Sequence, residues 1–162
     1  MVQINHSAHD AGHLKFETPP HVLVIEARFY NEINDHLIDG TMAALKKVSA
    51  TSEIITVPGA LEIPSALQFA AQTEKYDAYV VLGCVIRGET THYEIVSNES
   101  ARGVMDVALA YDLPVGNGIL TVENVEQAMD RADKSRQDKG GGAATAALMM
   151  LKLKQNFEGK TE

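Results

Sequence analysis

Four short apolar runs alternate along the chain with segments in which apolar residues recur at helical spacing. The runs cover residues 21–27, 54–57, 81–86 and 114–121. Runs of this length without a polar side are typical of strands that are buried on both faces. One helical segment follows each of the first three runs, and two follow the last. The residues expected to face the core from these helices are Ile33, Leu37, Leu45 and Val48, then Ile63, Leu67, Ala70 and Ala71, then Val96, Val104, Val107 and Ala108, then Val125, Ala128 and Met129, and finally Ala144, Ala147, Leu148 and Leu151.

Strands that alternate with helices require right-handed crossover connections, and these produce a parallel sheet with helices on both faces. We therefore predict an α/β fold, a three-layer α/β/α sandwich around a four-stranded parallel sheet. We expect Pro64 in the first turn of the second helix, and the last helix to begin after Gly142. Ligands of such sheets bind beyond the carboxyl ends of the strands. The turns expected to carry function are therefore 28–32, 58–63, 87–92 and 116–124.

A single domain is expected to account for the ordered part of the chain. Its 162 residues are enough for one full hydrophobic core and too few for two ordinary ones. The predicted domain covers residues 21–157. Residues 1–20 are polar and lack a period, so we expect a flexible N-terminal arm, and we expect residues 158–162 to be frayed.

Composition limits the partners and the compartment. A formal charge of −8 and a pI near 5.2 argue against nucleic acid or an anionic membrane as the main partner. The one cysteine, Cys84, lies in an apolar run and is interpreted as an inert buried thiol. The first twenty residues contain no apolar stretch of the signal-peptide kind, so the cytoplasm is the expected location. His6, His9 and His13 share the spacing of a helical face and could hold a metal, but Gly12 and the lack of an apolar stripe favour a mobile tail.

The turn at 87–92 is a candidate phosphate site. Gly88 allows a ligand to approach the backbone closely, and the amides of Glu89, Thr90 and Thr91 are expected to be unpaired donors at the positive end of a helix. Such a helix start can bind a phosphate group. The pattern alone is weak, because most helix N-termini bind only water.

His92 is the candidate general base. Thr91 precedes Glu94 by three residues, which is the spacing of a capping box, so the helix is expected to start with Thr91 as N-cap and His92 as its first residue. The helix dipole at this end disfavours imidazolium, which leaves a neutral imidazole able to accept a proton. A partly exposed histidine without a catalytic role is the alternative interpretation.

Two further turns carry residues that suit a polar heterocycle. Glu62 lies where a strand ends and a helix begins; its carboxylate either favours the helix dipole or accepts hydrogen bonds from a polyol. Phe29 follows the first strand, where an aromatic ring either closes the core or stacks on a planar ligand. Four cations, Arg131, Lys134, Arg136 and Lys139, form a local excess in an acidic chain, and they indicate either an anion attractor or a solvated helix end.

Several stretches, taken in order, resemble the lumazine synthase family. They include Val57-Pro-Gly-Ala-Leu-Glu-Ile-Pro64 and, at the centre of residues 83–99, Ile86-Arg-Gly-Glu-Thr-Thr-His-Tyr93. The others are residues 27–29, residues 118–128 with Arg131, and residues 138–140. The resemblance spans about residues 22–155. The ordered set is far more specific than any one of its members.

The resemblance implies a flavodoxin-like fold and an enzyme of riboflavin biosynthesis, a transferase. The implied reaction condenses 5-amino-6-(D-ribitylamino)uracil with 3,4-dihydroxy-2-butanone 4-phosphate and yields 6,7-dimethyl-8-ribityllumazine, inorganic phosphate and water. No metal or other cofactor is implied. Joining two bound substrates depends mainly on proximity, orientation and one proton shuttle, which agrees with the residues in the turns. A non-catalytic flavin or lumazine carrier or receptor on the same fold, and a structural shell, are the alternatives.

The resemblance also implies a role for each site residue. His92 would move protons during imine formation and phosphate elimination. Phe29 would stack on the pyrimidine, Glu62 would bind ribityl hydroxyls, and the amides of residues 89–91 would take the phosphate. The remaining implied contacts are the backbone of Ala60, Leu61, Val85 and Ile86 to the heterocycle and ribityl chain, and Arg131 and Lys139 from a neighbouring subunit.

The chain departs from the family pattern at positions that bear on assembly and binding. Asn117 stands where many members carry an aromatic residue that packs over the heterocycle from the adjacent subunit, and Tyr30 stands where asparagine is common. A hydrogen bond from Asn117 is therefore expected in place of stacking. Residues 133–138 lack the Gly and Asn of shell-forming members, so we expect a homo-oligomer that is a pentamer or two pentamers face to face, rather than a capsid of about sixty subunits.

Overall fold

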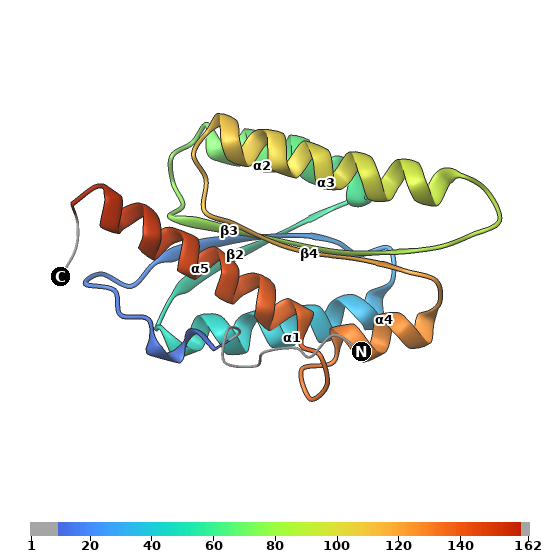
Figure 1. Cartoon of the computed structure of the whole chain (residues 1–162), viewed down its shortest axis with the longest axis horizontal. Helices are drawn as coiled ribbons and strands as arrows, with labels where there is room; N and C mark the ends of the chain where they lie inside the picture. The colour runs from blue at the N-terminus through green and yellow to red at the C-terminus, as the bar shows by residue number, and fades with distance from the viewer. Residues whose placement is uncertain (1–9, 160–162) are drawn as a thin grey trace.

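The computed structural model describes residues 10–159 and contains one four-stranded sheet, with all neighbouring strands parallel (Figure 1). The strand order is β2-β1-β3-β4. This confirms the predicted α/β fold of the flavodoxin-like kind. The strands are β1 (His21–Ala27), β2 (Thr51–Val57), β3 (Ala78–Ile86) and β4 (Val115–Val122).

Two strands begin three residues earlier than the apolar runs predict. β2 starts at Thr51 instead of residue 54, and β3 starts at Ala78 instead of residue 81. β2 lies at the edge of the sheet, and its residues are exposed or half-buried, so its first residues can be polar and still pair with β1. The apolar run therefore marked only part of β2, because an edge strand does not need to be buried on both faces.

Helices cover both faces of the sheet, as predicted (Figure 1). On one face, α2 (Ile63–Ala71) and α3 (His92–Ala110) pack on odd-numbered strand residues such as Leu23, Ile25 and Val81. On the other, α1 (Asn31–Lys47), α4 (Val125–Ala132) and α5 (Lys139–Phe157) pack on even-numbered ones such as Val22 and Val80. The buried strand residues thus divide between two cores, because successive side chains point to opposite faces.

Pro64 lies in the first turn of α2, as expected, but the expected start of the last helix was wrong. α5 begins at Lys139, so the three glycines form its first turn. One of them is there for space, because a Cβ on Gly140 would lie 2.0 Å from the carbonyl oxygen of Leu37. On the facing strand β4, a Cβ on Gly116 would lie 1.7 Å from the carbonyl oxygen of Ala143. The glycines let α5 approach α1 and β4 at backbone distance.

Most of the expected core positions are buried or half-buried, and one is exposed. Val125, the first residue of α4, is 57% exposed, whereas Ala128 and Ala132 are fully buried one turn apart. The buried stripe of α4 therefore starts one turn later than predicted. Val96 and Ala108 of α3 are half-buried.

The N-terminal segment is described from Asp10 onward. A 3-10 helix, η2 (Ala11–His13), buries Ala11 completely, and the adjoining Phe16 packs against the core of α1 and α5. Lys47 of α1 donates to Asp10 over 2.8 Å. The part of the expected arm after residue 9 thus contacts the domain. Within residues 10–159, no helix has the length and apolar content that crossing a membrane requires.

Candidate functional site

A pocket of about 400 Å³ lies at the carboxyl ends of β1, β2 and β3, the right-hand end of the sheet in Figure 1. It is formed by three of the four turns that the sequence singled out. The turn after β4 does not line it. The lining residues are Ala27, Phe29, Tyr30, Pro58, Gly59, Ala60, Leu61, Glu62, Cys84, Val85, Ile86, Gly88, Thr90, His92, Tyr93 and Val96.

Phe29 offers an open aromatic face to this pocket. It follows β1 directly, and its side chain is 73% exposed. The half-buried ring of Tyr30 meets it edge-on, with centroids 5.1 Å apart and an interplanar angle of 69°. A T-shaped contact with a single ring leaves at least one face of Phe29 open, and a planar ligand can stack there.

The segment after β2 brings a carboxylate to the pocket. β2 ends at Val57, Pro58 and Gly59 break it, and the 3-10 helix η3 (Ala60–Glu62) leads into α2. Glu62 lines the pocket and is exposed; its carboxylate lies close to Gly59, where a Cβ would be 3.1 Å from Oε2. Among residues 10–159 no group pairs with this exposed carboxylate, so it can accept hydrogen bonds from hydroxyl groups of a ligand.

The floor of the pocket is apolar. It consists of the last residues of β3, Cys84, Val85 and Ile86. Burial raises the pKa of the Cys84 thiol to about 12, so this cysteine is protonated near neutral pH. The interpretation of Cys84 as an inert buried thiol agrees with this environment.

α3 begins at His92 as predicted, but the predicted capping box was wrong. The side chain of Thr91 makes no capping hydrogen bond, and the His92 amide instead donates to Oγ1 of Thr90 over 3.3 Å. Glu94 does not reach back to the helix start, because Arg87 binds its carboxylate. An arginine partner is a stronger attraction for a carboxylate than a neutral backbone amide.

The loop before α3 has the donors that the sequence predicted. Within residues 10–159, no backbone or side-chain acceptor of the chain receives the amides of Glu89, Thr90 or Thr91. His92 is exposed and lines the pocket beside Gly88 and Thr90. Free amides at the start of a helix, next to an imidazole, can hold an anion and transfer a proton at the same place.

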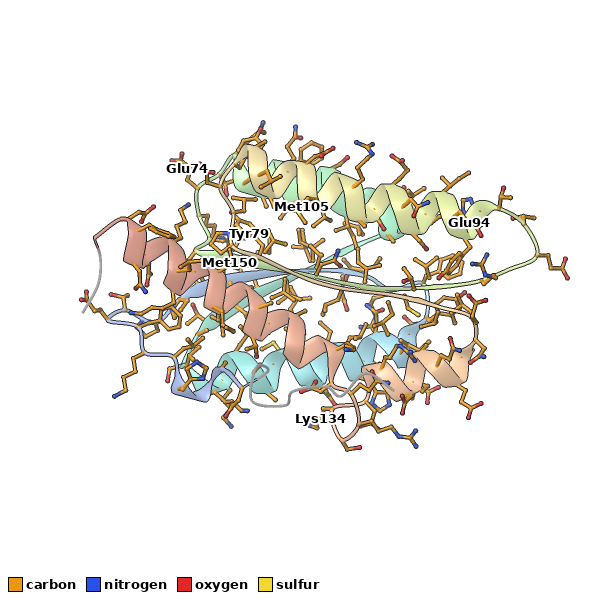
Figure 2. All side chains as sticks on the ribbon, viewed as in Figure 1. Glu74, Tyr79, Glu94, Met105, Lys134 and Met150 are labelled. Atoms are coloured by element: carbon orange, nitrogen blue, oxygen red, sulfur yellow. The ribbon has the colours of Figure 1, made fainter. Side chains whose placement is uncertain are left out.

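Arg87 ties this loop to the rest of the sheet, and the sequence did not single it out. Its guanidinium pairs with Glu94, donates from Nε to Oε2 of Glu123 over 2.8 Å, and lies 4.1 Å from the ring centroid of Tyr93. The hydrogen bond from Arg87 lowers the pKa of Glu94. Glu94 marks this end of α3 in Figure 2. The partners of Arg87 on α3 and after β4 become visible only once β3 and β4 are paired.

Five of the predicted site residues do not line the pocket, namely Glu89, Thr91, Asn117, Arg131 and Lys139. Asn117 is exposed on β4, and its Oδ1 accepts from the amide of Ile119 over 2.9 Å. Arg131 donates to the carbonyl oxygen of Gln127 over 3.1 Å. Of the other cations, Lys134 lies in the loop between α4 and α5, away from the sheet (Figure 2). One chain therefore brings together the aromatic, carboxylate and imidazole groups, but not the cations.

Among residues 10–159, no three histidine, cysteine or acidic side chains gather closely enough to hold a metal ion. Of the histidines considered from their spacing, His6 and His9 lie outside the described residues, and His13 ends η2.

Known proteins with similar sequences carry one description. The family model described as 6,7-dimethyl-8-ribityllumazine synthase matches residues 19–155. A protein of that name from Sphingopyxis alaskensis is 62% identical over 138 residues, covering 85% of this chain and 96% of its own. Those from Bartonella tribocorum and Agrobacterium fabrum are 58% and 54% identical, and the matches cover 85% and 86% of this chain and 92% and 98% of theirs.

The match extends over all four strands and over every turn that lines the pocket. The identity is high over nearly the whole length of each relative, so this chain and its relatives share one fold and one domain organisation. The chain belongs to the 6,7-dimethyl-8-ribityllumazine synthase family, an enzyme family of riboflavin biosynthesis.

Proposed function

We propose that the pocket condenses 5-amino-6-(D-ribitylamino)uracil with 3,4-dihydroxy-2-butanone 4-phosphate, giving 6,7-dimethyl-8-ribityllumazine, inorganic phosphate and water. The observation that carries the proposal is the convergence of Phe29, Glu62 and His92 on one pocket in a chain of this family. No described residue favours a non-catalytic carrier over the enzyme, and the relatives are named as synthases.

The pyrimidine substrate suits the segments after β1 and β2. Phe29 stacks on the planar ring, and Glu62 accepts hydrogen bonds from ribityl hydroxyls. The backbone of Ala60 and Leu61, together with that of Val85 and Ile86 on the floor, binds the polar edge and the ribityl chain. An exposed ring and an exposed carboxylate at the rim of an apolar floor support this orientation.

The phosphate of the second substrate suits the start of α3. The free amides of Glu89, Thr90 and Thr91 donate to it, helped by the positive end of the helix dipole. His92 then accepts and returns protons as the 5-amino group attacks the ketone to form the imine, and as phosphate leaves. Holding both substrates side by side lowers the barrier without a strong protein nucleophile.

The site is completed by a second subunit. Asn117, Arg131 and Lys139 lie away from the pocket of their own chain, while Phe29 is left 73% exposed and Leu61 39% exposed at its rim. We infer that the three residues reach the phosphate and pyrimidine side of a neighbouring subunit's pocket in a homo-oligomer, a pentamer or two pentamers. We also propose that the enzyme works in the cytoplasm, as its single reduced thiol suggests.

Mixing the two substrates with the protein tests the proposal. The visible absorbance of the lumazine product should rise much faster than in a mixture without protein, and light scattering on the same sample should give the mass of a pentamer or decamer. A product rate equal to that of the protein-free mixture contradicts the enzyme. A monomer with full activity contradicts the proposal that the site is shared between subunits, but it leaves the proposed reaction intact.

A further inference from the structure

A polar network is centred on the carboxylate of Glu26 in β1, next to the segments that form the pocket. The side chain of Glu26 is only 6% exposed, which is unusual for an acidic residue. Oε1 accepts from Oγ1 of Thr56 over 2.9 Å. Oε2 accepts from Nη1 of Arg28 over 3.1 Å and from Nδ2 of Asn34 over 3.3 Å.

The three partners of Glu26 come from three segments that each lead to the pocket. Thr56 pairs with Glu26 across the β1–β2 ladder and lies two residues before Pro58. Arg28 directly precedes Phe29. Asn34 belongs to the first turn of α1, and its amide donates to the carbonyl oxygen of Tyr30 over 3.0 Å. One buried carboxylate therefore connects the segment that carries Phe29 with the segment that carries Glu62.

Arg28 is fully engaged within the chain and is not a free cation of the pocket. Its Nε donates to Oδ1 of Asn31 and its Nη2 to the carbonyl oxygen of Asn31, both over 3.2 Å. Nη2 also pairs with Asp35. The guanidinium thus holds the backbone on both sides of Phe29, from Glu26 in β1 to α1. A planar group with several fixed donors holds such a loop more rigidly than lysine can.

Buried networks of this kind behave as a unit. Removing one donor from a buried carboxylate leaves charge without a partner, so the remaining groups rearrange to satisfy it. Two of the groups around Glu26 adjoin the pocket segments: Arg28 precedes Phe29, and Thr56 lies two residues before Pro58, so their rearrangement is expected to move those segments. These segments make the contacts proposed for the pyrimidine, and loss of binding that is equal in the ground state and the transition state raises KM and leaves kcat unchanged.

We propose that Glu26, with Arg28 and Thr56, is a positioning group that sets the place of Phe29 relative to the 58–62 segment and thereby the affinity for the pyrimidine substrate. The inference rests on the proposed function. It assigns the network to one substrate: the heterocycle touches both connected segments, whereas the phosphate site and His92 belong to the loop before α3. None of the three side chains lines the pocket itself.

The test compares Thr56→Val with Thr56→Ser in the full-length protein. Valine keeps the shape and removes the donor to Glu26, and serine keeps the donor. For Thr56→Val we expect a KM for the pyrimidine raised about tenfold, and a KM for the butanone phosphate and a kcat within about twofold of wild type. Thr56→Ser should restore the wild-type KM. Tight binding of the product, followed by its own fluorescence, should weaken in parallel.

Tyr76→Phe is the matched control. Its hydroxyl also donates to a glutamate of β2, with 2.7 Å between Oη of Tyr76 and Oε2 of Glu53, but at the opposite end of the strand. Both variants lose a hydroxyl donor to a carboxylate, so both are expected to be less stable. Tyr76→Phe should nevertheless leave both KM values unchanged, because its site lies far from the pocket segments. If Thr56→Val does not fold, Arg28→Lys takes its place and should show the same division between the two KM values.

The outcomes separate the inference from the function on which it rests. A wild-type protein that does not accelerate the reaction contradicts the proposed function. An active wild type whose Thr56→Val and Arg28→Lys variants keep the ratio of the two KM values overturns the positioning role, as does an equal shift in Tyr76→Phe.

Discussion

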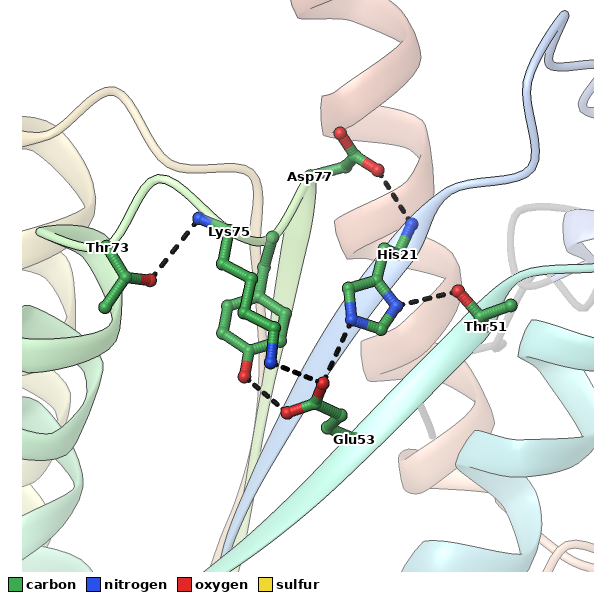
Figure 3. Close-up of polar contacts among 7 residues, drawn as sticks. His21, Thr51, Glu53, Thr73, Lys75 and Asp77 are labelled. Carbon is green, nitrogen blue, oxygen red and sulfur yellow. Dashed lines mark hydrogen bonds and ion pairs between the residues drawn. The ribbon is translucent and has the colours of Figure 1, made fainter.

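The two ends of the sheet each hold a glutamate in a polar network, and they serve different purposes. At the carboxyl end, Glu26 connects segments that border an open pocket. At the amino end, Glu53 receives Lys75 over 2.6 Å, the hydroxyl of Tyr76 over 2.7 Å and Nε2 of His21 over 3.4 Å (Figure 3). Among the described residues, the polar groups of this Glu53 network pair with one another.

Aromatic rings and backbone bonds complete the Glu53 network. The ring of His21 stacks on Tyr76 with centroids 5.2 Å apart, and its Nδ1 bonds Oγ1 of Thr51 over 2.7 Å. The amide of His21 donates to Asp77 (Figure 3). The hydrogen bond from Lys75 is the main cause that lowers the pKa of Glu53 to about 2.

The difference follows from the direction of the chain. In a parallel sheet each helix begins near the carboxyl end of the preceding strand, so the unpaired amides of helix starts gather at that end. The loop of Glu89, Thr90 and Thr91 is an example. At the amino end helices finish and strands start, and the polar groups there have been paired with one another. We propose binding and reaction for the carboxyl end of the sheet, and stabilisation of the fold for the amino end.

The largest expected effect is that of His92→Ala at the carboxyl end of the sheet. Losing the proton shuttle should lower kcat about a hundredfold or more while KM changes little. Because His92 is exposed, the free energy of unfolding should change by less than about 0.5 kcal/mol. Steady-state kinetics and urea unfolding measure both quantities. Equal turnover in the variant and wild type would remove the proton-shuttle role.

The amino end of the sheet should give the opposite result in Tyr76→Phe. The variant removes a half-buried hydroxyl that donates to the Glu53 carboxylate, and the free energy of unfolding should fall by about 1–2 kcal/mol. The values of kcat and KM should stay at wild-type level. Loss of activity without loss of stability would show that the two ends are not separated in function.

A smaller effect on the free energy of unfolding is expected for Glu53→Gln, and this effect should depend on pH in the acid range. A pKa lowered in the folded state means that the charged carboxylate favours folding above its ordinary range, near 4.3. That contribution is lost as the pH falls from there toward about 2. The difference in unfolding free energy between wild type and variant should therefore be largest above pH 5 and shrink steadily below it, in urea titrations at a series of pH values. A difference that is independent of pH would contradict this assignment.

The last prediction concerns the reactivity of Cys84 at the floor of the pocket, and it changes the comparison of the two ends least. With a pKa of about 12, only about one thiol in ten thousand is ionised at pH 8. Alkylation of the native protein should therefore be far slower than that of the urea-unfolded protein, as followed by mass spectrometry. The chain has no other cysteine, so the label reports this position alone. Rapid labelling of the native protein would mean that the floor opens to solvent.

The periodic pattern predicted much of this structure and part of the site. The four strands except for the starts of β2 and β3, the place of Pro64 in the first turn of α2, the helix start at His92 and the three turns around the pocket were predicted, because burial of one face or both leaves a local trace in the sequence. The capping box at Thr91 and the start of α5 were wrong. Contacts outside the local pattern decided both. Arg87, seven residues before Glu94, pairs with its carboxylate, and the packing of α5 against α1 leaves no space for a Cβ on Gly140 inside the helix.

By itself, therefore, the sequence determined the order and type of the elements, the family, and which turns carry reactive groups. Only the tertiary structure decided that Phe29, Glu62 and His92 share one pocket, that Glu26 joins Arg28 to Thr56, and that Arg131 and Lys139 lie away from it. The physical reason is range. Periodicity records contacts between residues a few positions apart, whereas strand order and register set which residues meet across thirty or more positions.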